Sequence, residues 1–172
     1  MSLATFTTQN ANFLGYRLGN TGVSREAYQI NELFFKVVEH LFKNETFGES
    51  RLEGYKSLEE VAQEANEPNW DGYNGIAVNA LSLYQASEFL NALPASIPTP
   101  EIGVDPDGEI SFDWYRGKNH LFSVSVGETG KLTFAGIFGL SKIHGVEYMG
   151  DVIPGIILLN IQRVLGEDIN YP

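Results

Sequence analysis

The stretch that decides the fold class is EISFDWY, residues 109–115. Its large apolar side chains, Ile110, Phe112 and Trp114, stand at every second position, and polar side chains separate them. Successive side chains of a β-strand point to opposite faces, so this alternation predicts a strand with one face on a core and the other face wetter. A helix would scatter the three apolar groups around its axis, and the strand is therefore the preferred interpretation.

Further strands are expected beside this one, because the chain reverses over short distances. The sequence DPDG at 105–108 is a strong β-turn signal, since proline presets φ and glycine accepts a left-handed conformation. GETG at 127–130 predicts a second hairpin loop, and loops this short make successive strands antiparallel neighbours. Residues 141–149 are open to two interpretations, a last edge strand or an irregular crossover. The sequence predicts an antiparallel β-meander of about four strands, at roughly 101–105, 109–115, 120–126 and 131–140.

Helices are expected before and after the meander. From Ser24 onward, apolar side chains recur at three- and four-residue steps, which is typical of a helix with one buried face. Ser57 and Glu60 have the spacing of a capping box, and Asp151 can cap a last helix with Pro154 in its first turn. The predicted helices cover roughly 24–43, 57–66, 77–92 and 152–165, with a polar connection at 44–56.

These elements predict the α+β class, with a meander packed against helices. We expect residues 1–23 to form an irregular N-terminal arm, because they are rich in Thr, Asn and Gly. Residues 24–172 are expected to form a single domain, since the sequence shows neither an internal repeat nor an interdomain linker.

The composition limits the classes of function. The chain has 172 residues, enough to bury a core in one domain, and its formal net charge is −11. An acidic surface repels phosphate backbones, so no nucleic-acid partner is expected. The sequence has no cysteine, which excludes disulfides and thiolate chemistry. It also has no long apolar run and no secretion signal, so we expect a cytoplasmic protein without a membrane partner.

Residues 67–75, EPNWDGYNG, form a constrained loop with two large aromatic side chains. One interpretation is structural: Trp70 fills the seam between helix and sheet, and Asp71 caps a turn. The other is functional: Trp70 and Tyr73 are the walls of a recognition loop that presents the carboxylate of Asp71. Tyr115, on the wetter face of its strand, would extend that surface.

Three histidines, His40, His120 and His144, are candidates for acid–base or metal chemistry. His40 lies beside the apolar stripe of the first predicted helix, where packing explains it. On a strand, His144 and Glu147 point to opposite faces and cannot chelate one ion together, so no metal site is predicted. The sequence lacks a nucleophile elbow and the glycine motifs that cradle phosphates, and no cofactor is expected.

The residues NWDGY at 69–73, a helix after them, and DPDGEISFDW at 105–114 resemble a group of small bacterial proteins with no assigned activity. The resemblance covers roughly residues 67–140 and leaves the first predicted helix aside. It implies a bacterial cytoplasmic origin and carries over no catalytic residue.

Two classes of function follow from the sequence. The first is a non-enzymatic protein-binding accessory module, of the immunity or antitoxin kind, whose binding residues are Trp70, Asp71, Tyr73 and Tyr115. The rival is a small hydrolase that uses His120 or His144 together with Asp71 or Glu147. Convergence of the aromatic and titratable side chains on one concave pocket would favour the enzyme, and a spread over a flat surface would favour the binding module.

A homodimer is also predicted. Its basis is Phe35 together with part of the apolar stripe on the long first helix, which would contact a second copy.

Overall fold

The computed structural model describes residues 49–166. The predicted arm at 1–23 and the predicted helix at 24–43 lie outside the described residues, and so do Phe35 and His40. Three helices and a five-stranded antiparallel sheet make up the described part, which confirms the α+β class. No helix within residues 49–166 is long and apolar enough to cross a membrane.

The sheet is a meander whose strands follow one another in chain order. Its strands are β1 (Glu101–Val104), β2 (Ile110–Tyr115), β3 (His120–Val126), β4 (Lys131–Phe138) and β5 (Ser141–Tyr148). The sheet has five strands rather than the predicted four, because residues 141–148 form β5. This confirms the edge-strand interpretation of that segment. Gly139 takes the left-handed conformation, with φ of 66°, and turns the chain so that Phe138 pairs with Ser141.

One face of the sheet packs on the core. Ile110, Phe112 and Trp114 are 0%, 0% and 2% exposed, which confirms the predicted alternation in β2. The rings of Phe89 and Phe112 lie 4.9 Å apart, and the indole N–H of Trp114 donates to the Pro98 carbonyl over 3.1 Å. Buried aromatic and aliphatic side chains of β2, β3 and β4 continue this layer.

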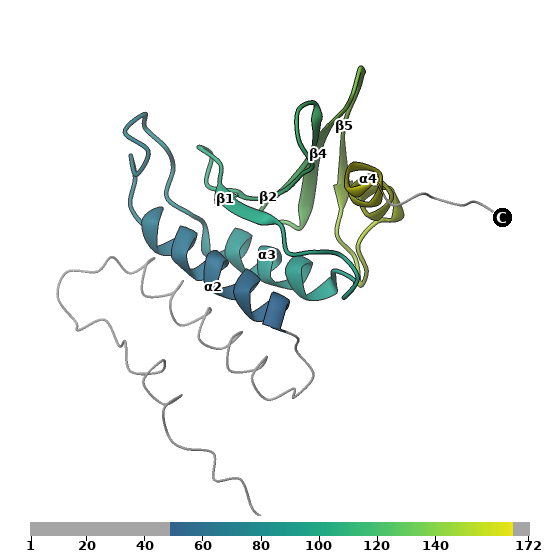
Figure 1. Ribbon diagram of the computed structural model, residues 1–172. Coiled ribbons are helices and arrows are strands. Elements are labelled where there is room, and N and C mark those ends of the chain that lie inside the picture. Colours follow the sequence, from purple (N-terminus) through teal and green to yellow (C-terminus); the bar gives the residue numbers. More distant parts are fainter. Residues whose placement is uncertain (1–48, 167–172) are drawn as a thin grey trace, which may run out of the picture.

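Helices α2 (Glu49–Glu64), α3 (Ala80–Ala92) and α4 (Gly155–Leu165) cover this core face. α2 contacts β1 and α3 contacts β2 and β3, whereas α4 contacts β2, β3 and β4. In Figure 1, α2 and α3 lie beneath the β1–β2 end of the twisted sheet, and α4 lies beside the β4–β5 end. All three helices therefore leave the opposite face of the sheet without a helical layer in the described chain.

The predicted helix starts need correction. The described part of α2 begins at Glu49, so the predicted start at Ser57 is wrong, and so is the polar connection over residues 49–56. The rest of that predicted connection, 44–48, lies outside the described residues. Gly54, which suggested a connection, lies inside α2. A Cβ at this position would lie only 3.1 Å from a side-chain carbon of Leu90 in α3. The absence of a side chain at Gly54 therefore allows α2 and α3 to pack closely.

The last two helices begin three residues later than predicted. Asn79 caps α3, since its side-chain oxygen accepts a hydrogen bond from the Leu81 N–H over 2.7 Å. α4 follows Pro154 and has no side-chain cap, so the predicted cap at Asp151 is wrong. Gly166 ends α4 in the left-handed conformation, with φ of 72°.

Candidate interaction surface on the open face of the sheet

We call the face of the sheet opposite the core the open face. Its members follow from the strand register, because paired residues of antiparallel strands point to the same side. They are Glu101, Gly103, Ser111, Asp113, Tyr115, Leu121, Ser123, Ser125, Lys131, Thr133, Ala135, Ile137, Lys142, His144, Val146 and Tyr148. Small and polar side chains occupy its centre, whereas the core face is aromatic and aliphatic.

Carboxylates face each other across the β1–β2 hairpin on this open face. Glu101 pairs directly with Asp113 in the strand register. One step past the strand ends, the Asp105 N–H donates to the Glu109 carbonyl over 2.9 Å, which makes these two acidic residues a second cross-strand pair. Like charges directly opposite each other destabilise a sheet in general, and this hairpin places two such pairs on one face.

The second acidic pair shares one hydroxyl group. The Ser125 hydroxyl oxygen lies 2.6 Å from Asp105 Oδ2 and 3.0 Å from Glu109 Oε2. A serine hydroxyl has one hydrogen and donates it to one carboxylate at a time. The described residues offer these carboxylates no ion-pair partner. An incoming cationic group would relieve the repulsion that remains between the two acceptors.

Two further polar atoms of the open face are buried and have no hydrogen-bond partner among residues 49–166. They are Oδ1 of Asp113 and the hydroxyl oxygen of Thr133, which lie on the strands that flank β3. A buried polar atom without a hydrogen bond costs about 1–3 kcal/mol. The open face therefore holds polar groups that the described part of the chain does not satisfy.

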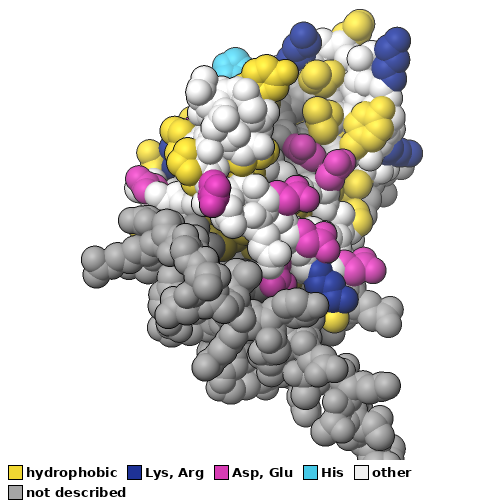
Figure 2. Space-filling view, turned by 90° about the vertical axis from the view of Figure 1, so that its left-hand side faces the viewer, with side chains coloured by type: hydrophobic (Ala, Val, Ile, Leu, Met, Phe, Trp, Pro, Cys, Tyr) yellow, Lys and Arg dark blue, Asp and Glu magenta, His cyan; other side chains and the backbone are white. Residues whose placement is uncertain are grey.

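The open face is divided by charge. Acidic side chains lie on the β1–β2 side, whereas Lys131, Lys142 and His144 lie on the β4–β5 side. Tyr115 and Tyr148 stand on this face with 66% and 64% of their surface exposed. On the side of the molecule drawn in Figure 2, acidic side chains gather across the middle, with hydrophobic side chains, Lys and Arg toward the upper right.

The loop at 67–75 is held by its own hydrogen bonds. The indole N–H of Trp70 donates to the Ile76 carbonyl over 3.0 Å, and the half-buried ring packs against the core. The Tyr73 and Gly75 N–H groups donate to Asp71 Oδ1, each over 2.8 Å. These bonds hold the pKa of Asp71 below its ordinary value of 3.8. The side chain of Tyr73 is 87% exposed and projects from this loop.

The structure does not bring the four candidate binding residues together. The loop at 67–75 lies beside the β1–β2 turn, because Ile76, the residue directly after it, donates its N–H to the Pro106 carbonyl over 2.8 Å. Tyr115 lies at the other end of β2, about 17 Å along the strand from its first residue. Trp70, Asp71 and Tyr73 thus form one group and Tyr115 belongs to another.

The candidate catalytic residues are also separated. His120 begins β3, at the Tyr115 end of the sheet and away from the loop of Asp71. His144 and Glu147 lie on β5 and point to opposite faces, which is what the strand interpretation of this segment implied. No group of three or more His, Asp or Glu side chains within residues 49–166 is placed to hold a metal ion.

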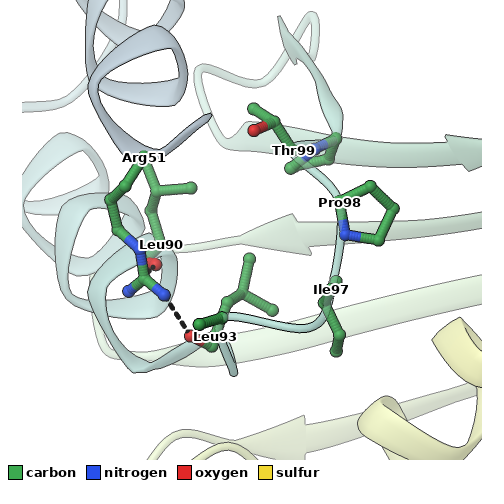
Figure 3. Close-up of a pocket in the computed structure, with 8 residues that line it drawn as sticks. Arg51, Leu90, Leu93, Ile97, Pro98 and Thr99 are labelled. Carbon is green, nitrogen blue, oxygen red and sulfur yellow. Dashed lines mark hydrogen bonds between the residues drawn. The ribbon is translucent and has the colours of Figure 1, made fainter. Parts of the chain in front are cut away.

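A small cavity of about 80 Å³ lies between the ends of α2 and α3, and it contains none of these candidate residues. Figure 3 shows Arg51 reaching across it to the Leu93 carbonyl. The same guanidinium donates to the carbonyls of Leu90, over 3.0 Å, and Asn91. Arg51 therefore caps the C-terminus of α3, where its positive charge also interacts favourably with the negative end of the helix dipole. The cavity is a product of helix packing.

Sequence reasoning missed the open-face residues of β5 and the paired carboxylates. Val146 and Tyr148 fell in a segment with two competing interpretations, although His144, Val146 and Tyr148 do alternate with Ile143 and Gly145. The pairing of Glu101 with Asp113 requires the register, which turn length alone does not give. No family model, curated protein or solved structure matches the chain. The resemblance of residues 67–140 to a bacterial group therefore stays a prediction.

Proposed function

We propose that this chain is a protein-binding module whose open face receives a lysine- or arginine-bearing segment of a partner protein. The observation that carries the proposal is the placement of like charges opposite each other, Glu101 with Asp113 and Asp105 with Glu109. Such a hairpin gives up folding stability, and departures from local stability rules concentrate at functional sites. A partner's cations would convert this repulsion into charge-assisted hydrogen bonds.

The remaining features of the face support the same function. Tyr115 supplies an exposed aromatic ring beside the acidic half, and tyrosine is enriched at the centres of interfaces. The formal net charge of −11 steers a basic partner toward the chain. An accessory of the immunity or antitoxin kind, acting in the cytoplasm, fits this description. The rival hydrolase gains no support, because Asp71 and His120 lie on elements apart from β5, and His144 and Glu147 point to opposite faces of β5.

Cross-linking combined with affinity capture tests the proposal. The full chain is used to capture partners from lysate of its native cell, and a zero-length carbodiimide then joins its carboxylates to lysines of the captured protein. We expect cross-links from Glu101, Asp105, Glu109 or Asp113, because these carboxylates lie on the open face. Cross-links confined to α2, or to the loop at 67–75, would contradict the proposal.

A matched pair of variants makes the test specific. Glu101→Gln combined with Asp113→Asn removes two charges from the open face, and Glu60→Gln combined with Glu64→Gln removes two exposed charges from α2. Both double variants change the net charge equally. We expect the first to lose the partner and the second to keep it, whereas equal retention would show that the open face is not the binding surface.

A further inference from the structure

The two edges of the sheet differ in how they are protected. β1 is four residues long, follows a segment that contains Pro98 and Pro100, and packs against α2. β5 is eight residues long and contains no proline, and the main contacts of α4 are with β2, β3 and β4. Long edge strands without protection pair readily with another strand. Within residues 49–166, β5 is the edge that is open to such pairing.

The register shows which backbone groups of β5 point outward. The two-residue turn at 139–140 makes Phe138 and Ser141 a hydrogen-bonded pair, and bonded pairs then recur at every second residue. The Met149 N–H donates to the Gly130 carbonyl over 2.8 Å and fits the same series. The intervening residues direct their N–H and C=O groups away from β4. These residues are Lys142, His144, Val146 and Tyr148.

We propose that β5 is a self-association edge, on which β5 of a second copy of this chain pairs antiparallel and extends the sheet across a two-fold axis. A two-fold axis perpendicular to the sheet keeps equivalent faces on the same side. The four residues whose backbone groups point away from β4 must then pair with the same set in the second copy, because within the described part of the chain only these have free N–H and C=O groups along the edge. In the register centred on Gly145, all four residues find such a partner. This register pairs Lys142 with Tyr148 of the second copy and His144 with Val146 of the second copy. A register centred on His144 would leave Tyr148 without a strand partner.

Charge favours a second copy as the occupant. The whole chain has a formal net charge of −11, whereas β5 carries one lysine and one glutamate and is formally neutral. Two copies can therefore meet along this strand without the repulsion that other parts of the surface would impose. Apolar side chains also stand exposed along the strand, with Val146 at 50% and Tyr148 at 64%, and pairing would cover them. Pairing along β5 uses backbone groups at the sheet edge and is independent of any partner on the open face.

Hydrogen exchange measured at high and low protein concentration tests the edge directly. At a concentration where light scattering gives a dimeric mass, we expect the Lys142, His144, Val146 and Tyr148 amides to exchange at least about tenfold slower than in dilute protein. The Ile143, Gly145 and Glu147 amides bond to β4 within one copy, so their exchange should be unchanged. This alternation distinguishes strand pairing from any other dimer.

Cysteine cross-linking tests the register, and the absence of native cysteine keeps it free of background. Lys142→Cys combined with Tyr148→Cys should yield a covalent dimer under mild oxidation, because directly paired residues lie about 5.5 Å apart, within disulfide reach. Lys142→Cys combined with Val146→Cys fits the register centred on His144 and should remain uncross-linked. The reverse result would overturn the register proposed here.

A proline substitution in β5 is the third test of the pairing. Val146→Pro removes an N–H that points away from β4, so the β4–β5 ladder keeps its bonds, and Val146→Thr is the control that retains the N–H. We expect the proline variant to be monomeric where the wild type and the threonine variant are dimeric. If the proline variant does not fold, the exchange pattern of the wild type decides. A monomeric wild type overturns the proposal, whether its outward amides exchange fast or are protected by another segment.

Discussion

The loop at 67–75 and the open face of the sheet both carry aromatic side chains and carboxylates, but they use them differently. In the loop, Asp71 accepts two backbone N–H groups and Trp70 donates to a backbone carbonyl, so the polar atoms serve the fold. On the open face, Glu101 and Asp113 pair across the strands, and Asp113 Oδ1 is buried with no hydrogen-bond partner in the described part of the chain. The satisfaction of polar groups, more than residue type, separates side chains that hold the fold from side chains left for a partner.

The largest effect on stability is expected at Trp70. Trp70→Ala removes a half-buried ring from the core edge together with its hydrogen bond to the Ile76 carbonyl. Burial is partial, so we expect a loss of about 2–3 kcal/mol in the free energy of unfolding, below the 3–5 kcal/mol typical of fully buried aromatic residues. Equilibrium unfolding in urea measures this loss.

Tyr73→Ala is the control within the same loop. Its side chain is 87% exposed, so the free energy of unfolding should change by no more than about 0.5 kcal/mol. If Trp70→Ala were as stable as Tyr73→Ala and the wild type, Trp70 would not hold the loop to the core. The aromatic residues of the loop would then again be candidates for recognition.

A smaller, pH-dependent effect is expected at Asp71. The backbone N–H bonds from Tyr73 and Gly75 lower its pKa in the folded state below 3.8, so the unfolded chain binds a proton first as the pH falls. The stabilisation is therefore complete above the unfolded pKa and is lost as the pH falls through the folded pKa. Asp71→Asn should be less stable than the wild type near neutral pH, and the two should converge in acid. Thermal unfolding over a pH series measures the difference, and a gap that stays constant with pH would contradict this account.

The sequence predicted the architecture because its signals are local. The alternation in EISFDWY and the DPDG turn define β2 and its hairpin without reference to the rest of the chain. The start of α2 could not be predicted in this way, since Gly54 resembles a linker glycine until Leu90 of α3 is placed against it. The open face was equally hidden, because the pairing of Glu101 with Asp113 depends on register. The helix start and the open face thus depended on partners distant in sequence, which local patterns do not reveal.

Removing the charges from the open face should stabilise the fold. Glu101→Gln combined with Asp113→Asn replaces a like-charged cross-strand pair with neutral amides, and the gain should be a few tenths of a kcal/mol and at most about 1 kcal/mol. The midpoint of thermal unfolding should rise, and the rise should shrink at high salt because salt screens the repulsion. A fall in the midpoint would mean that these carboxylates stabilise the fold, as Asp71 does in its loop.

The smallest effect on stability, and the sharpest contrast between the two regions, is expected at Tyr115. Its side chain is 66% exposed, so Tyr115→Ala should leave the free energy of unfolding within about 0.5 kcal/mol of the wild type. If the open face binds the partner, the same substitution should weaken capture at least about tenfold, which corresponds to about 1.4 kcal/mol of binding free energy. Tyr73→Ala removes a more exposed tyrosine from the loop and should leave capture unchanged. Two tyrosines that are equally dispensable for folding then report separately on the two regions. Weaker capture by the Tyr73 variant alone would return the binding role to the loop.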